Sequence, residues 1–524
     1  MRSARLACVS FALFGVISSH VQADVVGRML AIADDQPGGT PPPEQSSDLT
    51  AWAGEPRATT LPELLQIALR QAPALQSAKL DIAIAEARIQ ETWARNDWLL
   101  QAQLKGSRAY GIIANGVTVD TDTRFDGTAD LSRLLPTGGT VGLHLASNYE
   151  TSNFHTDTTP RIDGSTTSWI QDISGSITQP LLKGRGRTLF EANEVKATLA
   201  RDVNVLAKRL AAIQTVQAVI AAYWDLVLAE RTVAITQQSL DLARERLRVT
   251  QIGADGGKTP RSEIPAVLQI IATREEDVLQ GELGVLNSSI TLRRATGMPI
   301  GAGELGLRVA TDLDTQDEPL DLGKLVERAY AASPELAELA KQDDSATIDI
   351  AVTENGLLPQ LDAALSFGPT GTATTFGQSW QNLVELKTIS IGGTLTFSRG
   401  LEQNDVRGRI REQRETKRKL TVNAFDVRAQ IAQTMARAVA QVELARRRVA
   451  LSQRAIELAN ENIKIESDRF NLGKSTNFDV LNRLEDLRQA ELRQAQALID
   501  WHKGDAGIQA LTGDILPLYG IALD

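Results

Sequence analysis

The chain contains two copies of one long segment, and this duplication constrains its fold more than any other feature. Residues 215–268, shifted forward by 216 positions, align with residues 431–484 without a gap. The alignment places the dipeptide Gly257-Lys258 on Gly473-Lys474. A duplicated unit of this length is much longer than a solenoid repeat of roughly 20–50 residues. The sequence therefore predicts a protein built from two similar halves.

The first copy is longer than the second. Nearer the N-terminus the copies align at a second offset, 261, which pairs Leu104 with Leu365. The difference between the offsets, 261 − 216 = 45, means that about 45 additional residues lie between Leu104 and Gly184. They include the run Leu134–Thr140 (L-L-P-T-G-G-T), whose Pro and Gly residues are typical of a turn between strands. The additional residues could thus add a hairpin to the first half, and the number of strands stays open.

The N-terminus has the pattern of a secretory signal peptide, which we assign to residues 1–23. Arg2 and Arg5 precede an apolar run that extends to about Ser18, and Val21-Gln22-Ala23 suits a cleavage site. The single cysteine of the chain, Cys8, lies within this segment. The mature protein is therefore expected to contain no disulfide bond and no thiol chemistry.

Composition argues against several classes of function. The formal net charge of −10 disfavours nucleic acid as a partner. No stretch of roughly 18 apolar residues follows the signal peptide, so no transmembrane helix is expected, and only a β-barrel could hold such a chain in a membrane. The histidines beyond the signal peptide, His144, His155 and His502, are scattered, and no nucleophile lies beside a base. We predict no catalytic residue, no metal site and no cofactor.

Two stretches of more than 60 residues contain neither Gly nor Pro, Thr188–Ile252 and Arg409–Leu472. As a single helix, each would span about 100 Å at roughly 1.5 Å per residue, which indicates a coiled-coil-like assembly. The stretches lead into similar turns at Gly257–Thr259 and Gly473–Ser475. A second helix of about 35 residues is expected directly after each turn. The sequence therefore predicts two long helical hairpins.

Between the helical stretches, apolar residues recur with a period of two. This alternation is clear over residues 389–397, and residues 141–145 and 173–177 show it in the first half. Strands with lipid on one side and water on the other have this pattern, and so does a small soluble sheet. One chain holds too few strands to close a barrel, because single-chain barrels start at about eight. A barrel would therefore require an oligomer.

Three motifs carry a resemblance to a known family. They are Leu357–Leu361 (L-L-P-Q-L), Gln179–Gly184 (Q-P-L-L-K-G) and Arg469–Leu481, which begins with Arg-Phe and ends with Asp-Val-Leu. Together with the duplication and the signal peptide, these motifs resemble the outer-membrane efflux proteins typified by TolC, over about residues 58–515. The chain departs from the family pattern at Trp98, where a proline is expected, and in the additional residues of the first half.

The resemblance implies a mainly helical fold with a β-barrel part. Three copies would form a homotrimer in which each repeat gives two strands to a twelve-stranded outer-membrane barrel, and the long helical hairpins would continue the barrel as a periplasmic tunnel. The expected divisions are a signal peptide (1–23), a linker-like N-terminus (24–57), a first repeat (58–298, strands at about 99–182), an equatorial inter-repeat linker (299–319), a second repeat (320–515, strands at about 360–398) and a C-terminal tail (516–524).

The implied function is that of a passive exit duct for efflux or type I secretion. A periplasmic adaptor (membrane fusion) protein and an inner-membrane transporter would open the duct at its periplasmic tip, and the transporter would supply the energy. Drugs, metal ions, a secreted polypeptide and a polysaccharide precursor all stay open as cargo. Two alternatives also stay open, a periplasmic coiled-coil scaffold without a barrel and a self-contained porin, although the small number of strands disfavours the porin.

The resemblance also implies residues at the periplasmic entrance, where the family carries two aspartates three residues apart. The first matches Asp479, and the second position is Asn482 here. A threefold axis would make Asp479 a ring of three carboxylates, which favours cations and raises the pKa of Asp479 itself. Asp479 could also cap a helix N-terminus, and the two roles are compatible.

The family closes its tip with polar links between the second hairpin and the first. The matching residues are Phe470 and Ser475, which would face Ser262 and Glu263. Phenylalanine has no hydroxyl, and serine lacks the reach and charge of a guanidinium, so these links are not expected to be inherited unchanged. The alternative partners for Glu263 are Arg469, Arg261 and Lys474.

The hairpin turns themselves are the expected docking points for an adaptor, since an adaptor would recognise their shape. The turn residues in question are Gly257, Lys258, Gly473 and Lys474. The glycines are expected to supply the left-handed residue that ends a helix.

Overall fold

The computed structural model describes residues 57–114, 117–156, 159–257, 260–301, 305–309 and 319–522. The expected signal peptide, most of the linker-like N-terminus and Lys258 lie outside the described residues. The two halves share one order of elements: two helices, then strands, a very long helix and a returning helix. The mainly helical, duplicated fold with antiparallel strands is therefore confirmed.

The first half contains four strands. It begins with the helices α2 (Leu61–Gln71) and α3 (Pro73–Thr92) and the 3-10 helix η1 (Trp93–Asn96). The strands are β2 (Leu99–Ala114), β3 (Val117–Leu134), β4 (Thr140–Thr156) and β5 (Asp163–Pro180). The long helix α4 (Arg187–Asp255) follows, and α5 (Glu263–Thr296) packs along it.

The second half repeats this order with two strands. Its first helices are α6 (Leu322–Ala332) and α7 (Pro334–Asn355). The strands β7 (Gln360–Ala373) and β8 (Ile389–Ser398) flank a short helix, α8 (Phe376–Val384). The long helix α9 (Asn404–Asn471) leads to α10 (Asn477–Thr512) and the short α11 (Ile515–Leu518). The local sequence Ser333-Pro334-Glu335 predicts a helix start with Ser as the cap and Pro at the first position, and the structure confirms it, since the Ser333 side chain caps α7 and Pro334 is its first residue.

Two short strands join the start of the first half to the inter-repeat segment. β1 (Arg57–Thr59) pairs in parallel with β6 (Leu307–Val309), with Ala58 opposite Arg308. The expected inter-repeat linker, residues 299–319, is described over 299–301, 305–309 and residue 319.

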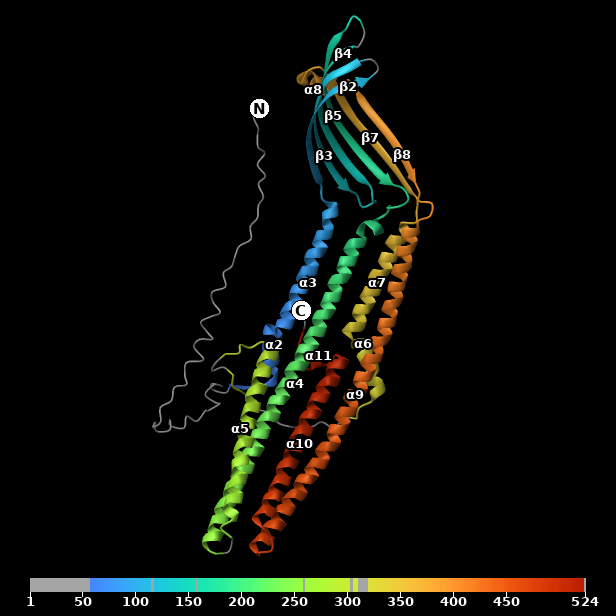
Figure 1. Ribbon diagram of the computed structural model, residues 1–524. Coiled ribbons are helices and arrows are strands. Elements are labelled where there is room, and N and C mark those ends of the chain that lie inside the picture. The colour runs from blue at the N-terminus through green and yellow to red at the C-terminus, as the bar shows by residue number, and fades with distance from the viewer. Residues whose placement is uncertain are drawn as a thin grey trace, which may run out of the picture. The chain divides into compact units, whose positions relative to one another are not determined.

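The six longer strands form one antiparallel sheet in the order β2-β3-β4-β5-β7-β8 (Figure 1). The expectation of two strands per repeat is therefore wrong for the first half, which supplies β2 to β5. The additional residues of that half form the hairpin β3–β4, which inserts between the two strands that correspond to β7 and β8.

The register of this sheet separates apolar from polar side chains. Ile177 of β5 lies opposite both Val141 of β4 and Leu365 of β7, while the next residue toward the N-terminus, Ser176, lies opposite Ser366. Because successive side chains point to opposite faces of a strand, one side of the sheet is apolar and the other is polar. Most of the apolar side is exposed in the protomer, with Leu104 and Ile391 91% and 80% exposed, and α8 packs against this side near Gly371.

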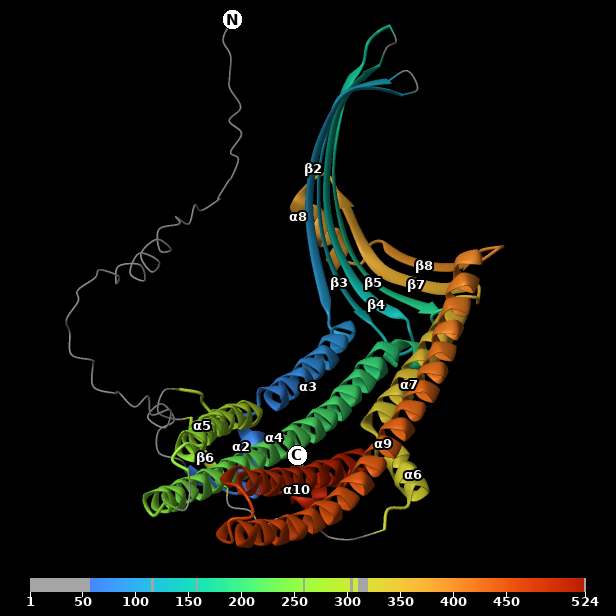
Figure 2. The ribbon, with the colours of Figure 1, turned by 60° about the horizontal axis from the view of Figure 1, so that its bottom comes forward.

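The helices pack in pairs that continue from the sheet. α4 packs on α5, α9 packs on α10, and α10 also contacts α4, which joins the two hairpins. Within the described residues, the sheet lies at one end of the helices and the hairpin turns lie at the other (Figures 1 and 2). Leu64, Leu226 and Ile499 are buried where the pairs meet.

Helix α4 is apolar enough to merit comparison with a membrane span. Among helices of the described residues, it alone contains an 18-residue window that is apolar enough to cross a membrane, by length and composition. However, 61% of that window is buried inside the protein. This burial is typical of a core helix.

Candidate functional site at the hairpin turns

The two long helices end in the same way, at a glycine with a left-handed backbone. Each long helix is followed by a glycine at positive φ, +70° for Gly257 and +71° for Gly473. Glycine adopts this left-handed conformation at little cost, which is why it commonly follows a helix end. Beside Gly473, the N–H of Lys474 donates to the carbonyl of Arg469 at 2.9 Å. Gly257, Gly473 and Lys474 are exposed, so both turns present their backbone to solvent.

The helix after the first turn begins later than the sequence suggests. The N–H of Glu263 donates to the carbonyl of Pro260 at 3.1 Å, which closes a turn ahead of α5. Ser262 stands at the N-cap position, is exposed, and makes no capping hydrogen bond through its side chain. After the second turn, by contrast, α10 begins at Asn477.

Four residues, one from each helix of the two hairpins, form what we call the tip cluster: Arg246, Glu263, Phe470 and Asn477. The guanidinium carbon of Arg246 lies 3.9 Å from the centre of the Phe470 ring. Its Nε donates to Oδ1 of Asn477 at 2.7 Å. Nδ2 of Asn477 in turn donates to Oε2 of Glu263 at 2.5 Å. A cation–π contact and two hydrogen bonds thus connect the second hairpin to the first.

The expectation of a basic partner for Glu263 is wrong. In the tip cluster, the observed partner is the uncharged side-chain amide of Asn477. Two of the three alternative partners pair elsewhere. Arg261 lies 3.9 Å from Asp255, and Arg469 lies 3.5 Å from Glu466. The position of Phe470 does link the hairpins, but through the face of its ring.

Arg246 is the central residue of the tip cluster, since it contacts both Phe470 and Asn477. Burial lowers its pKa, although the nearby carboxylate of Glu263 acts in the opposite direction. Its Nη2 atom is buried without a hydrogen-bond partner. A cation held in this way depends on Phe470, Asn477 and Glu263 together, so loss of any one of them should weaken the contact between hairpins.

Asp479 caps α10, as one of its two expected roles requires. Its Oδ2 accepts from the N–H of Thr476 at 3.0 Å, from the hydroxyl of Thr476 at 2.7 Å and from the hydroxyl of Ser475 at 3.2 Å. The Thr476 N–H above all, and then the two hydroxyls, lower the pKa of Asp479 in the protomer. Ser475 also donates to Glu466, so its hydrogen bonds stay within the second hairpin. Asn482 is exposed one turn further along.

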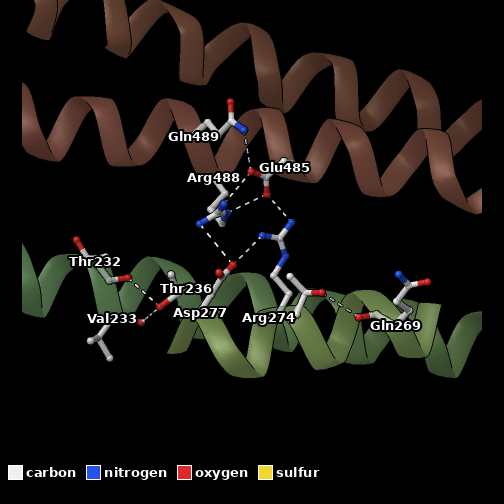
Figure 3. Close-up of polar contacts among 10 residues, drawn as sticks. Thr232, Val233, Thr236, Gln269, Arg274, Asp277, Glu485, Arg488 and Gln489 are labelled. Atoms are coloured by element: carbon white, nitrogen blue, oxygen red, sulfur yellow. Dashed lines mark hydrogen bonds and ion pairs between the residues drawn. The ribbon is translucent and has the colours of Figure 1, made fainter. Parts of the chain in front are cut away.

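A second link between the hairpins lies further along the helices from the turns (Figure 3). Arg274 and Asp277 of α5 and Glu485 and Arg488 of α10 form a four-charge network. Arg274 pairs with Glu485 across the helices and with Asp277 at 3.2 Å. Arg488 lies 2.8 Å from Glu485 and 3.8 Å from Asp277. Each charge therefore contacts two of opposite sign, one on each hairpin.

The four-charge network shifts the pKa of two of its members, Glu485 and Arg488. Burial opposes ionisation of Glu485, but hydrogen bonds from Arg488 and Gln489 and the charges of Arg488 and Arg274 lower its pKa from 4.5 to about 2. The same carboxylate raises the pKa of Arg488. Glu485 is therefore ionised at neutral pH.

Sequence reasoning places Glu263 and Phe470 where the two hairpins meet, but it does not identify Arg246 and Asn477, and it misses the four-charge network altogether. The only signal was two pairs of opposite charge spaced three residues apart, Arg274/Asp277 and Glu485/Arg488. Such pairs are equally typical of a solvated helix face. Only the packing of α5 against α10 shows that these charges meet, and no motif distinguishes Arg246 within α4.

The arrangement of sheet, helical hairpins and turns is that of a known class of protein. Residues 325–514, most of the second half, match the family model described as outer membrane efflux protein. The chain is similar to this family over that segment, about a third of its length.

Individual members of the class are distant relatives. The outer membrane efflux protein BepC of Brucella suis biovar 1 (strain 1330) is 22% identical over 285 residues, 54% of this chain and 59% of BepC. The chain thus spans less than two thirds of the length of that relative. The outer-membrane channel OprN superposes with a TM-score of 0.63 at 15% identity, covering 87% of this chain and 90% of OprN. CusC superposes with a TM-score of 0.63 at 12% identity, covering 92% of this chain and 98% of CusC.

Proposed function

We propose that this chain is one protomer of a homotrimeric outer-membrane exit duct for efflux or type I secretion. The observation that supports the proposal most directly is the sheet, which is apolar on one side, polar on the other and joined at one end to long helical hairpins. An exposed apolar side suits lipid, and a polar side suits a water-filled lumen. A soluble scaffold would have no use for side chains as exposed as Leu104 and Ile391, at 91% and 80%.

The helices would continue this lumen into the periplasm. α4 with α5 and α9 with α10 form two hairpins per protomer, so three protomers would surround a tube with walls of packed helices. The duct would be a passive conduit, because energy would enter through an inner-membrane transporter. An adaptor would contact the turns at Gly257 and Gly473, with Lys474 beside the second.

Opening would be a rearrangement of the hairpins near their turns. The tip cluster and the four-charge network hold the second hairpin against the first, and both would have to lengthen or break for the hairpins to separate. The links are polar and lie at the helix surfaces, so they can exchange for water when the hairpins part. The more apolar packing nearer the sheet would stay in place.

Asp479 would contribute to ion selection at the entrance. It lies in the first turn of α10, close to the hairpin end, and three copies around a threefold axis would focus a negative potential. In the assembled trimer, the mutual repulsion of the carboxylates would oppose the lowering of the Asp479 pKa by Thr476. With Asn482 in place of a second carboxylate, the ring would be a single one.

The test is conductance of the mature protein in planar lipid bilayers, compared for wild type, Asp479→Asn and Asp486→Asn. Asp486 is the matched control, since it is an acid of the same helix whose side chain is 56% exposed in an ion pair with Arg483. Trimeric channels that prefer cations, with a preference reduced in Asp479→Asn alone, are the expected result. A protein that forms no channels and needs no detergent would overturn the duct and favour a periplasmic scaffold.

A further inference from the structure

The hairpin β3–β4 has no counterpart in the second half, yet it is built into the centre of the first half's strands. β3 pairs with β2 from Leu99↔Ser132 to Ala114↔Val117, and β4 pairs with β5 from Thr140↔Thr178 to His155↔Asp163. The hairpin is therefore hydrogen-bonded on both edges along its length. A flap or an inserted plug would leave these edges free.

The apolar side of the sheet continues across this hairpin from Val141 to Leu145, and a single polar residue, Ser147, separates Leu145 from Tyr149. Leu143 of β4 lies between Leu131 of β3 and Gly175 of β5, and Leu145 lies between Ala129 and Ile173. Leu143 and Leu145 are 41% and 38% exposed. The polar side is equally continuous, since Ala146 has Thr128 and Asp172 as its neighbours in the sheet.

An aromatic row marks one boundary of this apolar side. The rings of Phe125 and Tyr149 lie 6.3 Å apart, Tyr149 and Trp169 4.6 Å, and Trp169 and Phe376 of α8 5.1 Å. Membrane barrels carry such aromatic girdles where lipid meets water. The hairpin supplies the first two rings of the row. From Val141 to Tyr149, β4 is about as long as the roughly 9–11 residues that a strand needs to cross a bilayer.

The turn of the hairpin is fitted to the opposite boundary. The hydroxyl of Thr137 donates to Oε1 of Gln179 at 2.7 Å, and the carbonyl of Thr137 accepts from the N–H of Gly186 at 3.0 Å. Gly138 has φ +85°, and a Cβ at this position would lie 2.2 Å from the carbonyl oxygen of Gly184. The turn is thus anchored where β5 passes into α4.

We propose that β3 and β4 are membrane-spanning strands of the barrel wall, so that three protomers form a closed barrel of 3 × 6 = 18 strands. The inference rests on the proposed function and replaces the twelve strands that the family resemblance implies. Closure requires β2 of one copy to pair with β8 of the next, because unpaired backbone groups cost several kcal/mol each in lipid. Both edge strands carry apolar side chains on the lipid side, such as Leu104 and Leu395, which are 91% and 67% exposed.

The consequence of 18 strands is a wider barrel lumen than 12 strands would give. Barrel diameter grows roughly linearly with strand number, so 18 strands give a barrel about 1.5 times as wide as 12, in the range where barrels enclose an aqueous channel. Side chains of the polar side would line it, among them Asp126, Asp130 and Glu150. Selection by size would then fall on the hairpin turns, and the barrel would admit whatever the tip releases.

The experiment uses single-cysteine variants in a Cys8→Ser background, reconstituted in vesicles and labelled with an environment-sensitive fluorophore. Leu145→Cys and Ala146→Cys are adjacent on β4 and are expected to face lipid and lumen, respectively. Spin-labelled lipid should quench most of the fluorescence at position 145 and little at 146, and aqueous iodide should do the reverse. Ile391→Cys and Ser390→Cys provide the same comparison on β8, whose place in the barrel does not depend on the additional hairpin.

The outcomes separate the inference from the proposed function. Alternation on both β4 and β8, with 18 strands in cross-section by electron cryomicroscopy, supports the inference. Alternation on β8 with iodide access at both β4 positions, or a cross-section of 12 strands, overturns the inference and leaves the exit duct standing. Loss of lipid quenching at all four positions overturns both.

Discussion

The four-charge network makes the sharpest prediction about how the two hairpins are held together. In Glu485→Gln, Arg274 and Arg488 keep only Asp277, 3.2 and 3.8 Å away, as a charged partner. The side chain keeps its size and can still accept a hydrogen bond. The substitution therefore removes one negative charge between two half-buried cations and little else.

The size of the effect follows from the pKa of Glu485, which is lowered from 4.5 to about 2. A pKa lowered by about 2.5 corresponds to at most about 3.4 kcal/mol, since a tenfold change in an equilibrium constant is about 1.36 kcal/mol. The carboxylate is partly exposed, and solvent screening reduces exposed ion pairs to about 0–1 kcal/mol, so about 1–2 kcal/mol is expected here. Because the folded-state pKa is the lower one, this contribution is present above pH 4.5 and is lost as the pH falls toward 2.

Hydrogen exchange of the intact protein, followed by mass spectrometry, measures this loss where it occurs. Peptides around residues 270–280 and 480–490 should exchange about 5–30 times faster in Glu485→Gln, which is the ratio that 1–2 kcal/mol of local opening free energy gives. Glu491→Gln is the matched control, because Glu491 lies on the same helix but burial raises its pKa. Neutralising Glu491 should leave exchange unchanged or slower.

A double-mutant cycle decides whether the effect is mutual. If Arg274 and Glu485 stabilise each other, the opening free energies lost in Arg274→Met and Glu485→Gln will sum to more than the loss in the double variant. Additive losses, or equal acceleration in Glu485→Gln and Glu491→Gln, would refute the view that the network joins the hairpins.

Three further predictions concern other parts of the chain. Arg246→Met should cost about 1–3 kcal/mol of local stability at the turns, seen as faster exchange around residues 466–480, and unchanged exchange there would contradict the tip cluster. Gly138→Ala should abolish heat-resistant trimers because its Cβ meets the Gly184 carbonyl, whereas Gly111→Ala, also at positive φ but with open space around it, should cost only about 1–2 kcal/mol; trimer band intensity on gels reports both. Burial lowers the pKa of His502 from 6.5 to about 4, so the unfolded chain takes up a proton at a higher pH than the folded protein. The free energy of unfolding should therefore fall as the pH drops from 6.5 toward 4. Thermal denaturation over this pH range measures the effect, which should be weaker in His502→Gln.

Local patterns were enough to predict the elements that carry the fold. The absence of Gly and Pro over Thr188–Ile252 and Arg409–Leu472 anticipated α4 and α9, since nothing in either stretch interrupts a helix. Ser333-Pro334 anticipated the start of α7 because capping depends on residues close in sequence. The sequence predicts too early a start for α5, because the turn between Pro260 and Glu263 is stabilised by a backbone hydrogen bond that does not depend on side-chain identity.

The candidate site was less predictable than the fold. The left-handed turn positions can be predicted from the sequence, because a φ near +70° favours glycine and both positions are glycine. The contact of Arg246 with Phe470, by contrast, joins helices 224 positions apart (470 − 246), and its geometry depends on how far one hairpin is rotated against the other. Charge makes Arg469, Arg261 and Lys474 alternative partners for Glu263, but the side chain within reach is the amide of Asn477.

The sequence by itself determined that this chain has two similar halves, long uninterrupted helices ended by glycine turns, and strands with an apolar and a polar side. Each of these features depends on neighbouring residues or on a repeat. Each is therefore visible in the sequence as a regular spacing of residues or as a stretch without Gly and Pro. The tertiary structure decided that the 45 additional residues enter the sheet as β3 and β4, and that charges on α5 and α10 meet. Both depend on pairing between distant segments, where the register of strands and the rotation of helices select among contacts that local patterns allow equally.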